Sequence, residues 1–129
     1  MPPIRLISFG FLHLDRAAPP AADRVEDVRE RLRDPAAARS ILDLDGRDLR
    51  VQKVVLNTPG ARELIINLAD YAQVPAGPRT IAIGCAGGRH RAPALVELLA
   101  LLLGDRGHAE VVVEHRHVNL PRVLKTGTV

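Results

Sequence analysis

Hydrophobic residues fall into short apolar runs and into longer repeats with helical spacing. The run over residues 4–11 is typical of a strand, and the run over residues 80–83 is typical of a central strand buried on both faces. Between these runs, five apolar residues share one face of a helix that Pro75 to Pro78 end: Leu64, Ile65, Leu68, Ala69 and Ala72. We predict an earlier helix over residues 48–57. The segment 57–60 then supplies a cap residue for the next helix and places Pro59 at the first helical position of that helix.

The strongest helical repeat follows a glycine-rich segment in the second half of the chain. Pro93 suits the first turn of this helix, and apolar residues lie on nearly every side of it, so we expect it to be heavily buried. Its leucines recur at i, i+3, i+4, i+7 and i+8: Leu95, Leu98, Leu99, Leu102 and Leu103. Gly107 closes the helix, and residues 110–115 are predicted to form another interior strand.

These elements predict an α/β domain with a small, mainly parallel sheet, flanking helices and right-handed βαβ units. We expect one domain over residues 1–118 and a flexible tail over residues 119–129, whose Arg122 and Lys125 serve solubility. Residues 17–21 are predicted to form a loop. Segment 24–33 fits both a helix and a strand, and both interpretations stay open.

Composition excludes several classes of protein. Hydrophobic residues make up 47% and charged residues 26% of the chain, which is ordinary globular usage, and the sequence shows no membrane span or signal sequence. We expect a cytoplasmic protein, and a single cysteine agrees with a reducing compartment. The charge of +3 comes mostly from arginines, which suit anionic partners, and the two Phe and one Tyr are too few for stacking unpaired bases. Any nucleic acid is therefore expected to bind through its phosphates and its shape.

The segment IAIGCAGGRHRAP, residues 81–93, combines glycines and basic residues directly behind a predicted strand. Ligands of open α/β sheets bind at the carboxyl ends of the strands, and glycines let a loop expose its N–H groups beside the positive end of the next helix. We predict that residues 86–89 cradle a phosphate through their N–H groups, with Arg91 as the gripping side chain and Arg29 beside it. The loop residues assigned to ligand binding are Cys85, Ala86, Gly87, Gly88, Arg89, His90 and Arg91.

Other interpretations of this segment stay open. It can be a tight turn with solvated basic residues, or the C-x5-R motif of a cysteine-dependent phosphatase, in which Cys85 and Arg91 are catalytic. Gly84 and Ala92 depart from the phosphatase pattern, and neither a Walker motif nor a dinucleotide G-x-G-x-x-G is present. His115 and His117 are candidates for a metal site, but the pair is weak support, and we expect no metal and no cofactor.

The glycine segment resembles the I-G-C-T-G-G-[KR]-H-R-S signature of the C-terminal domain in the RNase adapter protein RapZ family. Weaker similarities follow in the family's order along the chain: Ser8-Phe9-Gly10-Phe11 with His13, Asp27-Val28-Arg29, Val55-Leu56 before Thr58-Pro59-Gly60, and Glu114-His115-Arg116. Three positions depart from the family pattern, since Ala86 replaces Thr, Ala92 replaces Ser and Leu14 replaces Gly. The N-P-rich loop that follows D-V-R in the family is also changed, to residues 30–35.

The resemblance implies a domain similar to a phosphofructokinase subdomain that binds phosphorylated metabolites and, in enterobacterial members, small regulatory RNA. It adds Asp27 and His13 to the expected ligand-binding residues, and it implies a stand-alone C-terminal domain without the family's N-terminal P-loop ATPase part. We therefore favour a regulatory, metabolite-binding module over an enzyme. Its expected partners are a phosphorylated small molecule or nucleotide, structured RNA and further copies of the chain in a homo-oligomer. We expect no membrane partner.

Overall fold

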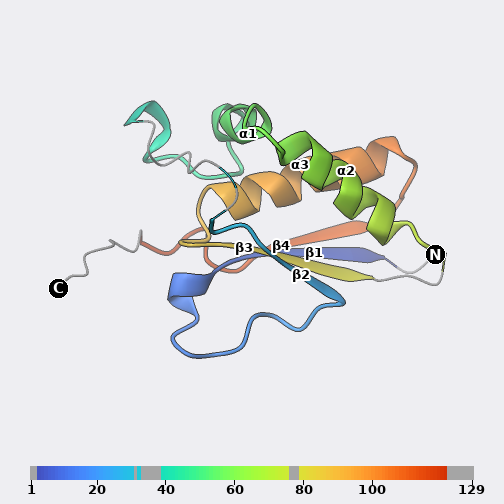
Figure 1. Ribbon diagram of the computed structural model, residues 1–129, viewed down its shortest axis with the longest axis horizontal. Coiled ribbons are helices and arrows are strands. Elements are labelled where there is room, and N and C mark those ends of the chain that lie inside the picture. The colour runs from blue at the N-terminus through green and yellow to red at the C-terminus, as the bar shows by residue number, and fades with distance from the viewer. Residues whose placement is uncertain (1–2, 31, 33–38, 76–78, 122–129) are drawn as a thin grey trace.

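Four parallel strands form one sheet in the order β2-β3-β1-β4 (Figure 1). A computed structural model describes residues 3–30, 32, 39–75 and 79–121. The strands are β1 (Ile4–Gly10), β2 (Arg24–Asp27), β3 (Thr80–Cys85) and β4 (Val111–His115). The helices are α1 (Leu49–Leu56), α2 (Ala61–Ala72) and α3 (Arg91–Asp105), with short 3-10 turns η1 (Phe11–His13) and η3 (Arg39–Ile41). The predicted parallel α/β fold is confirmed.

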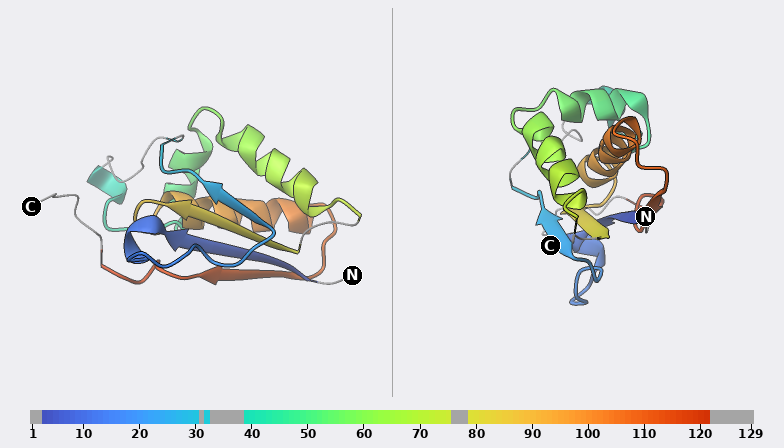
Figure 2. Two further views of the ribbon diagram at one scale, coloured as in Figure 1. Left: turned by 60° about the horizontal axis from the view of Figure 1, so that its bottom comes forward. Right: turned by 90° about the vertical axis from the view of Figure 1, so that its right-hand side faces the viewer.

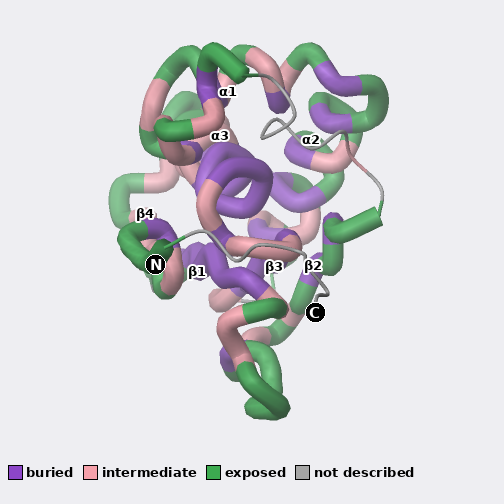
Figure 3. The backbone as a smooth tube through the Cα atoms, turned by 90° about the vertical axis from the view of Figure 1, so that its left-hand side faces the viewer, coloured by how far each residue is buried: buried purple, intermediate pink, exposed green. Residues whose placement is uncertain are grey.

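All three helices cover the same face of the sheet, as the two views in Figure 2 show. Alternation along the strands sends Ile4 and Leu6 of β1 and Ile81 and Ile83 of β3 into the core under these helices, where each is at most 1% exposed. A smaller cluster of Ile7, Phe9 and Ala82 lies on the opposite face. Phe11, Leu14 and Ala22 from the segment after β1 pack against it, and this segment projects from the sheet in Figure 3.

Most of the predicted elements are found within a few residues of their expected bounds. Of segment 24–33, the described residues 24–30 form strand β2 and a following turn, and the first strand ends at Gly10 because Phe11 begins η1. Gly107 has φ +96°, and the His108 N–H donates to Leu103 O at 3.0 Å, so glycine closes α3 as predicted. Residues 122–129 of the predicted tail, including Arg122 and Lys125, lie outside the described residues, as do residues 76–78 and the changed loop positions 31 and 33–35.

Three details of the prediction are wrong. Strand β4 lies at the edge of the sheet, so that Val112 is 47% exposed on the face without helices. Helix α2 begins at Ala61 after Gly60 in a left-handed conformation, two residues later than a cap before Pro59 requires. Helix α3 is heavily buried in its first turns, as predicted, and the prediction fails only toward its end, where Leu101 is 63% exposed. Within the described residues, no helix is long and apolar enough to cross a bilayer.

Candidate functional site

Residues 86–90 form the turn between the end of β3 and the start of α3, at the carboxyl edge of the sheet. We call this turn the glycine loop. Gly88 has φ +70°, and a Cβ added there would lie 2.6 Å from the Gly10 nitrogen at the end of β1. Only glycine fits this conformation and this contact without strain, so the loop lies directly against the β1 backbone. The predicted turn leading into a helix is confirmed.

The N–H groups of the loop divide into two kinds. The Gly88 and Ala92 N–H groups donate to the Cys85 Sγ at 3.2 and 3.4 Å, so these two donors are already used inside the molecule. The N–H groups of Gly87 and Arg89, by contrast, have no hydrogen-bond partner among the described residues. A Cβ added at Gly87 would meet nothing within 4 Å, so this part of the loop borders open space. The Gly87 and Arg89 N–H groups are therefore available to an anion.

The Cys85 thiol lies under the loop rather than at its open side. The residue is 3% exposed and belongs to the core between the sheet and the helices. Because the sulfur is buried in the core and not at the open side of the loop, this placement does not favour the phosphatase alternative.

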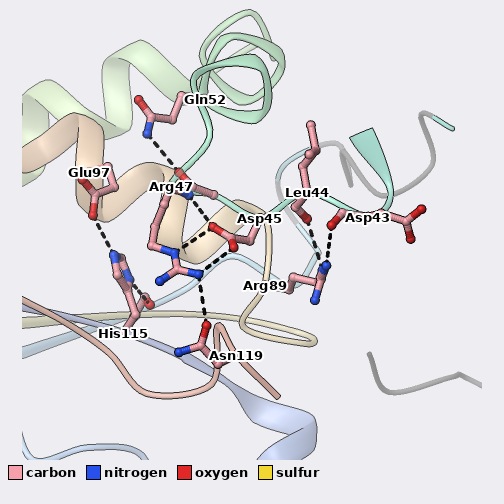
Figure 4. Close-up of polar contacts among 11 residues, drawn as sticks. Asp43, Leu44, Asp45, Arg47, Gln52, Arg89, Glu97, His115 and Asn119 are labelled. Atoms are coloured by element: carbon pink, nitrogen blue, oxygen red, sulfur yellow. Dashed lines mark hydrogen bonds and ion pairs between the residues drawn. The ribbon is translucent and has the colours of Figure 1, made fainter. Parts of the chain in front are cut away.

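The first two basic residues of the loop are fastened to residues 42–44. Arg89 donates from Nε to the Leu44 carbonyl at 3.1 Å and from Nη2 to the Asp43 carbonyl at 2.7 Å (Figure 4). The His90 Nε2 lies 3.2 Å from the Leu42 carbonyl. These side chains hold a neighbouring segment in place, a role that the prediction of ligand-binding residues did not include.

Arg91 is fastened in the same way to the turn after β2. The residue is 5% exposed, and its Nη1 lies 2.9, 2.9 and 3.2 Å from the carbonyl oxygens of Val28, Arg29 and Leu32. Its guanidinium therefore ties the turn that carries Arg29 to the start of α3. A contact between Arg91 and a bound phosphate stays a prediction.

Arg29 lies on the β2 side of the glycine loop in a fixed position. Its guanidinium stacks on the Phe11 ring with 3.8 Å to the ring centroid, and its Nε and Nη2 donate to both carboxylate oxygens of Asp27. The Arg29 guanidinium beside Asp27 holds the pKa of that carboxyl below its usual range. Since Leu12 donates its N–H to the Ala86 carbonyl at 3.0 Å, the η1 turn that carries Phe11 contacts the loop directly.

His13 and His117 lie near the loop on the side of β1 and β4. The Gly10 N–H donates to the His117 Nδ1 at 2.8 Å, and the two imidazole centroids are 5.0 Å apart. The His13 Nε2 is buried without a hydrogen-bond partner among the described residues. Burial lowers the pKa of His117, and the neighbouring His13 and Arg116 lower it further.

His115 belongs to a different cluster from His117. Its Nδ1 lies 2.6 Å from the Ser8 Oγ and its Nε2 lies 2.7 Å from the Glu97 carboxylate, on the helix side of the sheet (Figure 4). His115 and His117 therefore do not converge on one point. In the part of the chain that the structure describes, no group of three or more His, Cys, Asp or Glu residues is placed to hold a metal ion.

Sequence reasoning missed the packing role of Gly10, the Ser8–His115–Glu97 contacts and the pairing of Asp45 with Arg47 beside the glycine loop. The last of these has a sequence signal that could have been found. Asp-x-Arg occurs at residues 27–29, 45–47 and 48–50, and in each copy the carboxylate accepts the N–H and the guanidinium of the arginine two residues later.

Comparison with known proteins gives one family and a set of full-length relatives. The sequence profile of the RapZ C-terminal domain matches residues 2–119. The chain is 37% identical to a nucleotide-binding protein of Rubrobacter xylanophilus over 124 residues, covering 88% of this chain and 39% of the relative. Similar proteins of Alkaliphilus oremlandii (35% identity, covering 91% and 41%) and Streptomyces coelicolor (38% identity, covering 86% and 38%) also bear the name nucleotide-binding protein. The aligned part of the chain thus spans about two fifths of the length of these relatives.

Proposed function

Because the chain belongs to the RapZ C-terminal domain family, we propose that it is a non-catalytic regulatory module that binds the phosphate of a nucleotide or a phosphosugar at its glycine loop. The names of the full-length relatives support a nucleotide among the candidates. The module senses its ligand by binding it and does not transform it.

The observation that carries this proposal is the pair of unpaired N–H groups at the open side of the loop. Backbone N–H groups buried or half-buried without a partner are costly, and an oxyanion that accepts from both of them removes that cost. Gly87 and Arg89 supply these donors at the carboxyl edge of a parallel sheet, where α/β folds bind their ligands. The inward donors of Gly88 and Ala92 stay with the Cys85 sulfur.

Side chains around the loop supply the positive charge. Arg29 is held by Asp27 and Phe11, so little side-chain entropy is lost when its remaining N–H groups contact a phosphate oxygen. The His117 imidazole, which lies beside His13, adds a contribution on the opposite side that depends on its protonation. Arg89, His90 and Arg91 maintain the shape of the site by fastening residues 42–44 and the carbonyls of Val28, Arg29 and Leu32, and Arg91 also adds a buried charge near Asp27.

The test is calorimetric titration with matched pairs of ligands. A nucleoside monophosphate is compared with its nucleoside, and a sugar phosphate with the free sugar, at one stated salt concentration. We expect binding only of the phosphorylated members. Structured RNA forms a third arm, in which binding through phosphates alone predicts steep salt dependence and little base preference.

Gly87→Asp is the informative variant, because it places a carboxylate in the open space beside the two donors. We expect the affinity for the phosphorylated ligand to fall about tenfold or more, as for the loss of one charge-assisted hydrogen bond. Gly104→Asp is the matched control, because Gly104 also borders open space but lies near the far end of α3. Equal affinities for phosphorylated and unphosphorylated ligands, or equal effects of the two variants, contradict the proposal.

A further inference from the structure

Two arginines with identical local geometry flank the glycine loop. Arg29 and Arg47 each follow an aspartate at i−2 that accepts their backbone N–H at 3.0 and 2.8 Å and pairs with their Nε and Nη2. The Nη1 groups of both arginines have no partner among the described residues, and both side chains are nearly half exposed, at 46% and 47%. Each guanidinium is therefore fixed in direction while it keeps donors for a ligand.

The position of Arg47 is set by contacts on both sides of it. The Gly46 N–H donates to the Arg89 carbonyl at 2.8 Å, which ties the residue before Arg47 to the glycine loop. The Arg47 Nη2 donates to the Asn119 Oδ1 at 3.0 Å, beyond the end of β4 (Figure 4). Arg47 thus bridges the glycine loop and the segment after β4.

The sheet order places the two arginines at opposite ends of the site. Arg29 follows β2, the loop follows β3, and Arg47 reaches Asn119 behind β4, while the strands run β2-β3-β1-β4. A ligand phosphate at Gly87 and Arg89 therefore has one fixed guanidinium toward β2 and a second toward β4. A single phosphate group at the loop needs only one of these two guanidinium groups, that of Arg29.

We propose that the ligand of the glycine loop carries two anionic groups, such as the two phosphoryl groups of a nucleoside diphosphate. The first group binds the Gly87 and Arg89 N–H groups together with Arg29, and the second binds Arg47. This inference rests on the proposed function, because it assigns a ligand class to the same site. Neither Asp27 nor Asp45 has to leave its arginine, since each pairs with Nε and Nη2 while Nη1 receives the ligand.

The chain contains its own control for this assignment. Asp48 and Arg50 form a third copy of the pair at the start of α1, with the same N–H, Nε and Nη2 contacts. Arg50 is 71% exposed, and among the described residues its side chain makes no hydrogen bond or ion pair to the glycine loop or to residues 115–121. Arg47→Gln and Arg50→Gln each leave one aspartate unpaired, so they differ in position rather than in charge.

The experiment is calorimetric titration of the wild type and both variants with inorganic phosphate and with pyrophosphate at constant ionic strength. We expect the wild type to bind pyrophosphate about tenfold or more tightly than phosphate, the gain of one further charge-assisted contact. Arg47→Gln is expected to remove this preference while its phosphate affinity stays within about twofold, and Arg50→Gln is expected to change neither. If Arg47→Gln fails a melting control, Arg47→Lys takes its place in the titration, because lysine keeps the charge without the planar guanidinium fork.

The outcomes separate this inference from the proposed function. Phosphate binding without a preference for pyrophosphate overturns the two-anion ligand and leaves the phosphate site in place. Equal losses of pyrophosphate affinity in Arg47→Gln and Arg50→Gln overturn the assignment of the second anionic group to Arg47 and also leave the phosphate site in place. Failure of the wild type to bind either anion overturns both.

Discussion

Replacing Gly88 with alanine tests whether the glycine loop depends on its contact with β1. Gly88 has φ +70°, a conformation that costs an alanine about 1–2 kcal/mol. The added Cβ would lie 2.6 Å from the Gly10 nitrogen and 2.9 Å from the Phe9 carbonyl carbon, and this overlap with backbone costs about 1–3 kcal/mol more. We expect Gly88→Ala to lower the free energy of unfolding by about 2–5 kcal/mol, a large part of the stability of a domain of this size.

Urea denaturation followed by far-ultraviolet circular dichroism measures this loss, since the chain has no tryptophan. Gly87→Ala is the matched control, because its Cβ would meet nothing within 4 Å and its φ is not in the left-handed region. Gly87→Ala is expected to change stability by less than about 1 kcal/mol. Similar losses in the two variants, or a loss below about 0.5 kcal/mol for Gly88→Ala, refute this packing argument.

Three further predictions concern stability. Arg91→Ala is expected to lower the free energy of unfolding, measured by urea denaturation, by about 2–4 kcal/mol, because three carbonyls lose their buried donor. Arg89→Ala removes the donor of only two carbonyls at a more exposed position, so we expect a loss of about 1–2 kcal/mol. Equal losses contradict the role of Arg91 in tying the turn after β2 to α3. The depressed pKa of His117 means that the unfolded state binds its proton more readily, so stability is expected to fall as the pH drops below about 6.5. Urea midpoints at pH 7.5 and pH 5 check this, and a His117→Gln variant that loses as much as the wild type argues against it. Gly104→Ala is expected to raise the free energy of unfolding by about 0.5–1 kcal/mol, since the site is helical and open, and a lower midpoint would show an unforeseen contact.

Local signals made the fold and the glycine loop predictable from the sequence. The apolar run of β3, the glycines and the leucine repeat of α3 each act over a few residues, and together they allow little besides a strand, a tight turn and a helix. The predicted closure of α3 at Gly107 depends on one local conformation and is confirmed.

Features that depend on distant partners could not be predicted in this way. The Arg91 guanidinium meets carbonyls 59 to 63 residues away, and no local pattern distinguishes that role from a solvent-facing donor. The run Val111–Val113 looks like an interior strand, but its place at the edge follows from the insertion of β1 between β3 and β4. Gly10 gains its importance from its contact with the backbone of Gly87 and Gly88, which lie in the loop after another strand.

The central claim is that an anion binds at the Gly87 and Arg89 N–H groups, and amide chemical shifts report on it most directly. A ¹⁵N–¹H correlation spectrum of this 129-residue chain is followed during titration with inorganic phosphate at constant ionic strength and pH. The Gly87 and Arg89 amides are predicted to show the largest shifts, saturating with one common Kd, while the Gly60 and Gly104 amides stay unchanged as internal references. Saturable shifts centred elsewhere, or no saturable shift at Gly87 and Arg89, would contradict the account.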